Sequence, residues 1–99
     1  MNIEKLTTTE IQAGLKELPG WELKAEKLHR ELKFKNFVQA FGFMTQAAIL
    51  AQQMDHHPEW SNVYSRVTID LSTHTVDGIS QNDLELAGKI NELLANMTF

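Results

Sequence analysis

The chain has 99 residues and a formal net charge of −4, from 9 basic and 13 acidic side chains. Its 42% hydrophobic and 22% charged residues are typical of a folded globular protein, and its length indicates one domain over residues 1–99. The acidic balance disfavours electrostatically driven binding to nucleic acid or to an anionic membrane. The lack of cysteine excludes disulfides and zinc sites built on thiolates. No secretory signal or membrane-spanning run is visible, so we expect a cytoplasmic protein.

The first third of the chain predicts a short helix followed by a β-hairpin. Thr7 and Glu10 have the spacing of a capping box, and Pro19 should end the amphipathic helix that they begin. Apolar and polar residues alternate in the run 28–34, which indicates a half-buried strand paired with a short strand before it. His29 falls on the polar side of this run, where we expect a solvated side chain.

The middle of the chain predicts a long helix that lies across a sheet. Asn36 is a suitable N-cap, and the apolar residues of segment 37–54 form two neighbouring stripes that make one wide apolar face. This helix should end near His56, because Pro58 disfavours helical geometry at the residue before it.

Strand signals return after the long helix. Residues 66–72 alternate between polar and apolar side chains, while 62–64 fit either a separate strand or the start of the same one. Ser80 and Asp83 have the spacing of a second capping box, and the apolar stripe after them predicts a final helix. The order of the elements indicates an α+β sandwich with helices on one face of an antiparallel sheet. The open edges of such a sheet favour a dimer.

Three of the four histidines lie at predicted element ends, and three interpretations of them remain open. His56 and His57 suit a helix C-terminus, where a cationic imidazole complements the helix dipole. A metal site would use both with His74, and Asp55 or Glu59 would add oxygen, but adjacent helical side chains point about 100° apart and rarely converge on one ion. In the third interpretation the histidines face one cleft as general acid and base.

Several segments of the chain resemble one protein family. They are residues 55–60, which read Asp-His-His-Pro-Glu-Trp, residues 62–64, and residues 71–74, which read Leu-Ser-Thr-His before Gly78 and Asp83. They resemble the pterin-4a-carbinolamine dehydratases, whose mammalian members are also the dimerisation cofactor of a homeodomain transcription factor. The resemblance implies a two-layer α+β sandwich, with a four-stranded antiparallel sheet and three helices on one face, that assembles as homodimers or homotetramers.

The resemblance also implies a reaction. A dehydratase of this family removes water from 4a-hydroxytetrahydrobiopterin to give the quinonoid dihydropterin, which recycles the pterin cofactor of aromatic amino acid hydroxylases. The hydroxyl on carbon 4a needs a proton and nitrogen 5 must lose one, and imidazoles suit both transfers near neutral pH. No redox change occurs, so we expect no metal and no further cofactor, since the pterin is the substrate. The alternative is a protein-binding module that acts as a dimerisation cofactor or transcriptional coactivator.

Site residues follow from the match to the family motif. The catalytic candidates are His56, His57 and His74, with His56 and His74 handling the two protons. The expected substrate-binding residues are Asp55, His56, His57, Pro58, Ser72, Thr73, His74, Thr75, Asp83 and Trp21. For Asp83 a helix-cap role is an equal alternative, and for Trp21 a place in the core. Gln52 stands where the family often has an acidic residue, and helical spacing predicts that it faces His56.

Overall fold

The protein is described by a computed structural model that covers residues 3–97. Its elements in chain order are α1 (Thr8–Leu15), β1 (Glu22–Lys24), β2 (Lys27–Lys33), α2 (Phe37–Met54), β3 (Glu59–Val63), β4 (Arg66–Leu71), the short 3-10 helix η1 (His74–Val76) and α3 (Gln81–Asn96). Within these residues, no helix is both long enough and apolar enough to cross a membrane.

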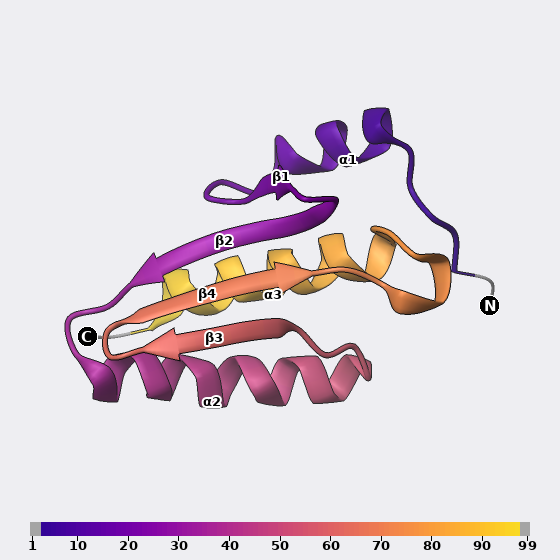
Figure 1. Cartoon of the computed structure of the whole chain (residues 1–99). Coiled ribbons are helices and arrows are strands. Elements are labelled where there is room, and N and C mark those ends of the chain that lie inside the picture. The colour runs from indigo at the N-terminus through magenta and orange to yellow at the C-terminus, as the bar shows by residue number, and fades with distance from the viewer. Residues whose placement is uncertain (1–2, 98–99) are drawn as a thin grey trace.

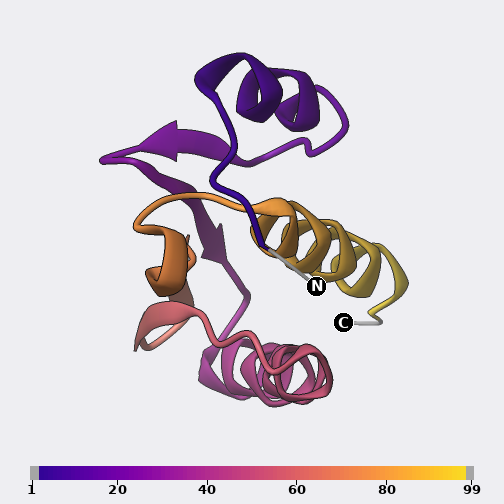
Figure 2. The same ribbon diagram turned by 90° about the vertical axis from the view of Figure 1, so that its right-hand side faces the viewer.

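The strands form one antiparallel sheet in the order β1-β2-β4-β3 (Figure 1). All three α-helices lie on the same side of this sheet, and its other face is left open (Figure 2). The predicted α+β sandwich is therefore confirmed. Residues 62–64 belong mainly to a separate strand, since β3 is paired with β4 across a tight turn at Tyr64 and Ser65.

The core lies between the sheet and the helices because the strands alternate. Leu28, Val67, Ile69 and Leu71 point towards the helices and are at most 1% exposed, and Phe43 of α2 is fully buried among them. Burying side chains of this size stabilises the fold by about 1.5–3 kcal/mol each.

The β1–β2 hairpin has a two-residue turn. Lys24 pairs with Lys27, and the residues between them, Ala25 and Glu26, have positive φ values of 51° and 63°. Two consecutive positive φ values are what a type I′ turn requires, and this turn matches the right-handed twist of the strands. The predicted β-hairpin is confirmed.

Capping residues set the helix starts as predicted. Thr7 and Glu10 form the capping box of α1, and the Asn36 side chain accepts the N–H of Gln39 at the start of α2. The predicted end of α1 is wrong, because the helix ends at Leu15. Two turns follow before Pro19, in which the N–H groups of Glu17 and Leu18 donate to the carbonyls three residues earlier.

The end of α2 is a Schellman motif. Asp55 adopts the left-handed conformation with φ of 52°, its N–H donates to the carbonyl of Gln52, and the N–H of His56 donates to the carbonyl of Ala51. The helix therefore ends close to His56 as predicted, but the left-handed residue, rather than Pro58, makes the turn.

The open face of the sheet carries one unexpected buried residue. His29 is only 7% exposed, and its ring nitrogens lie 2.8 Å from Asp70 Oδ1 and 3.0 Å from Glu31 Oε2. The prediction of a solvated side chain is wrong, because the neighbouring strand β4 brings Asp70 directly opposite His29.

Candidate active site

Three chain segments meet at one end of the sheet. β3 begins at Glu59 and β4 ends at Leu71, and the two strands are antiparallel with Glu59 opposite Asp70. The residues before β3 and those after β4 must therefore leave the sheet at the same end, where α3 also begins (Figure 1). Segments 55–58 and 72–75 are thus neighbours despite their separation in sequence.

Asp83 joins these segments through three hydrogen bonds. Its Oδ1 lies 2.5 Å from His56 Nε2, while its Oδ2 accepts the Thr73 hydroxyl at 2.8 Å and the Ser80 N–H at 2.9 Å. The Asp83 side chain is fully buried, and that of His56 is 11% exposed. A carboxylate withdrawn from water in this way is stabilised only by its donors. Asp83 caps α3, which agrees with the helix-cap alternative, and it also bonds His56; its expected contact with the substrate stays a prediction.

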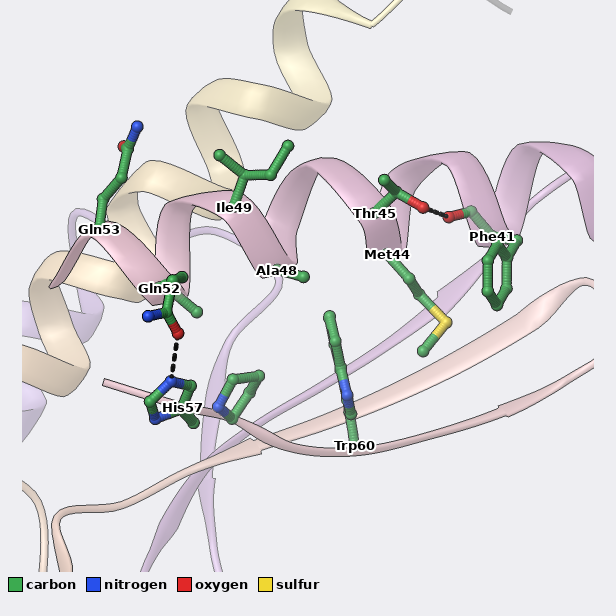
Figure 3. A pocket seen from close by; sticks show the side chains of 11 residues that line it. Phe41, Met44, Thr45, Ala48, Ile49, Gln52, Gln53, His57 and Trp60 are labelled. Atoms are coloured by element: carbon green, nitrogen blue, oxygen red, sulfur yellow. Dashed lines mark hydrogen bonds between the residues drawn. The ribbon is translucent and has the colours of Figure 1, made fainter. Parts of the chain in front are cut away.

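His57 points to a different place from His56. Its Nε2 lies 2.9 Å from Gln52 Oε1, and its ring borders an open groove of about 730 Å³ between α2 and β3. Figure 3 shows Trp60 on the β3 side of this groove, facing Met44 and Phe41 of α2. The expectation that Gln52 faces His56 is wrong, because the left-handed residue after α2 turns His56 away and brings His57 to the amide.

His74 belongs to a second, smaller cavity. This cavity of about 250 Å³ is bordered by Ser72, Thr73 and His74 after β4, and by Lys27 and Glu59 on neighbouring strands. Lys27 and Glu59 form an ion pair at 2.7 Å, and the Glu59 carboxylate raises the pKa of the Lys27 amine. His74 is exposed at the start of η1, and an antiparallel bridge between Thr73 and Gly78 closes the loop beneath it.

The structure thus brings the histidines into adjoining segments, where each ring has different surroundings. His56 shares Asp83 with Thr73, the residue before His74, whereas His57 contacts Gln52. In the described part of the chain no hydrogen bond links His74 to the other two histidines, and no group of three or more His, Asp or Glu side chains is placed to hold a metal ion.

The remaining predicted site residues fall into two groups. Asp55 and Thr75 are exposed and Pro58 and Ser72 are half-buried, and all four belong to the segments around the histidines. Trp21 is separate: it is buried in the core, and its indole N–H donates to Asn91 Oδ1 at 2.8 Å. Asn91 follows Asp83 by eight residues, which is about 12 Å along a helix. The core alternative for Trp21 is the one that the packing supports.

The sequence interpretation missed a contribution from Ser80. Its hydroxyl is fully buried and lies 2.7 Å from the Thr73 hydroxyl, so the helix cap is also part of the polar cluster around Asp83. The capping-box spacing identified Ser80 and Asp83 as a pair, but it contained no signal for Thr73 or His56.

Comparison with known proteins identifies the family of the chain. The family model described as pterin 4 alpha carbinolamine dehydratase matches residues 4–93. A protein of Prochlorococcus marinus (strain MIT 9303) named for this activity is 53% identical over 94% of the chain and 97% of its own length. One of Solibacter usitatus, named for the same activity, is 54% identical over 92% of the chain and 96% of its own length. The chain belongs to the pterin-4a-carbinolamine dehydratase family, a family of hydro-lyases.

A solved structure of the same family shares the fold. The crystal structure of a transcriptional coactivator/pterin dehydratase from Brucella melitensis is 44% identical to this chain, with a TM-score of 0.87. The match covers 90% of this chain and 97% of that one. The dehydratase fold described above is therefore shared along almost the whole chain.

Proposed function

We propose that this protein removes water from a 4a-hydroxytetrahydropterin such as 4a-hydroxytetrahydrobiopterin, giving the quinonoid dihydropterin, and that His56, His57 and His74 carry the chemistry. The observation that supports this most is Asp83, which bonds both His56 from one segment and Thr73 beside His74 from the other. Family membership supports the substrate class.

Elimination of water requires two proton transfers. The hydroxyl on carbon 4a leaves as water after it gains a proton, and nitrogen 5 gives up a proton as the double bond forms. His56 and His74 handle these two protons, while His57 holds the pterin or shares the acid role. Because Nε2 of His56 is bonded to Asp83, its Nδ1 is the nitrogen left for the substrate. General acid and base catalysis of this kind contributes roughly 100- to 10,000-fold in rate.

Pterin contacts come from the segments beside the histidines. Asp55, Pro58, Ser72 and Thr75 supply polar and apolar contacts for the ring, and Ser72 borders the cavity beside His74. The Thr73 hydroxyl is hydrogen-bonded to Asp83 and Ser80, so Thr73 holds other site residues in place and does not contact the pterin through its hydroxyl. The reaction balances without electron transfer, so the proposal needs no metal, flavin or nicotinamide, and the pterin is substrate rather than cofactor.

The experiment is an assay of freshly generated 4a-hydroxytetrahydropterin, with its decay followed in the presence and absence of the protein. The native chain should accelerate decay, and replacing both His56 and His74 with Ala should lower the rate roughly 100- to 10,000-fold. The fourth histidine supplies the control, since His29→Gln lies outside the site and should retain turnover. Native turnover in the double variant would refute the assignment.

We further propose a homodimer or homotetramer, with a functional link to a cytoplasmic aromatic amino acid hydroxylase that uses the recycled pterin. The assembly is supported by apolar side chains exposed on α2 and the edge strand β3, among them Val38 at 77% and Val63 at 73%. The same surface supports the alternative function, a protein-binding module. Loss of turnover with intact assembly in the double histidine variant would separate the two roles.

A further inference from the structure

A pair of buried hydroxyls beside Asp83 has no role in the proton transfers described so far. Ser80 is fully buried and Thr73 is 5% exposed, and their hydroxyl oxygens lie 2.7 Å apart. Ser80 caps α3, because its Oγ accepts the N–H of Asn82 at 3.2 Å. Capping uses the oxygen of a serine and leaves its hydroxyl hydrogen for another partner.

The geometry determines the direction of each hydrogen bond in this cluster. Thr73 has one hydroxyl hydrogen, which it donates to Asp83 Oδ2 at 2.8 Å. In the contact between the two hydroxyls, Ser80 must therefore be the donor and Thr73 the acceptor. The bonds run from Ser80 to Thr73 and from Thr73 to Asp83, and donors in such a chain polarise one another.

The other oxygen of Asp83 determines the tautomer of His56. The oxygens of an ionised carboxylate can only accept, so with Asp83 ionised the Nε2 atom that lies 2.5 Å from Oδ1 carries the hydrogen. When a carboxylate fixes the proton on one ring nitrogen, it also fixes the ring orientation and leaves the second nitrogen for chemistry. The position of Asp83 therefore decides where His56 Nδ1 is aimed.

We infer that Ser80 and Thr73 are positioning residues for the dehydration, because their hydroxyls hold the Asp83 carboxylate in the orientation that keeps His56 in the Nε2–H tautomer. This inference rests on the proposed function for its kinetic consequence, but its structural part concerns the free protein. Without the Thr73 hydroxyl, Oδ2 keeps only the Ser80 N–H, and the carboxylate is free to rotate away from the imidazole.

The test compares Thr73→Val, which keeps the branched shape and removes the hydroxyl, with Thr73→Ser, which keeps the hydroxyl. In ¹H–¹⁵N NMR spectra of the free protein, native His56 should show a protonated Nε2 with a downfield proton signal. Thr73→Val should weaken or shift that signal towards mixed tautomers, and Thr73→Ser should restore it. The expected fall in kcat is roughly 10- to 100-fold in the Val variant, the effect of a misplaced catalytic group, with KM changed less.

Ser80→Ala provides a second route that does not depend on the folding of Thr73→Val. It removes a helix cap as well as a donor, so Asn36→Ala, which removes the cap of α2, is its control. Only Ser80→Ala should alter the His56 signals. Native imidazole signals and native kcat in folded Thr73→Val or Ser80→Ala would overturn the inference. If the native chain has no turnover, the proposed function fails, while the imidazole spectra still decide the positioning role.

Discussion

At the scale of single residues, the contact between Gln52 and His57 shows how one backbone conformation selects a partner. His56 lies four positions after Gln52, the spacing of neighbours on a helix face. However, Asp55 leaves the helical conformation with φ of 52°, and the Gln52 amide lies against His57 instead, at 2.9 Å. A change at position 52 should therefore act on the histidine that borders the groove.

We predict that Gln52→Glu affects His57 and leaves His56 unchanged. A carboxylate at this position favours the charged imidazole through hydrogen bonding and charge, whereas an amide only orients the ring. In an NMR titration of the native chain and the variant, the ring signals of His57 should move at a higher pH in the variant. A shift of the His56 signals alone would contradict the contact described here.

At the scale of secondary structure, His29 connects strands β2 and β4 with a charge-dependent contact. The hydrogen bond to Glu31 and then that to Asp70 raise the pKa of His29, against burial and the nearby Lys24, which lower it. Both ring nitrogens face carboxylates, and both can donate only when the ring is protonated. The raised pKa of His29 means that the folded state binds this proton more tightly than the unfolded chain.

The free energy of unfolding should consequently depend on pH through His29. A raised folded pKa gives stabilisation that is fully present below the unfolded value near 6.5 and is lost as the pH rises through the folded pKa. The pKa of Glu31 is lowered by His29, so protonation of Glu31 removes the same contact at acidic pH. Urea unfolding of His29→Ala should show a loss of about 1–2 kcal/mol near pH 6 that shrinks at high pH. His74→Ala, at an exposed histidine, is the control, and a loss independent of pH would reject this account.

The elements themselves show which parts of the fold can be read from sequence. Thr7 with Glu10 and Ser80 with Asp83 specify helix starts because a capping box lies within four residues. The buried position of His29 has no local signal, because its partner Asp70 is 41 residues away on another strand. The hydrogen bond between His56 and Asp83 likewise joins residues that are 27 positions apart. Local patterns thus predicted the elements and the family motif, but the hydrogen-bond partners of the histidines depend on how the strands and helices pack.

At the scale of the whole molecule, the two edges of the sheet and the outer face of α2 remain uncovered. β1 and β3 are the edge strands, and α2 exposes Phe37, Val38, Phe41 and Ile49 beside β3. Exposed apolar side chains next to a strand with one unpaired edge are typical of a surface that another chain covers. This arrangement underlies the proposed homo-oligomer.

Charge introduced on this surface should weaken the assembly. Phe41→Glu removes an apolar contact worth about 1.5–3 kcal/mol, so association should become at least about tenfold weaker. Gln12→Glu, which adds the same charge to an exposed position on α1, should have no effect. Light scattering over a concentration series measures both variants, and a native chain that stays monomeric throughout would exclude the assembly.

The tight turn between β1 and β2 has a consequence for the cavity next to it. An Asn-Gly pair would adopt positive φ values at lower cost than Ala25 and Glu26, for which the left-handed conformation costs roughly 1–2 kcal/mol per residue. Yet these two residues also form part of the wall beside His74. A methyl group and a carboxylate thus stand where an Asn-Gly turn would place a carboxamide and bare backbone. Redesigning it as Asn-Gly should make the hairpin more stable and that wall less complete.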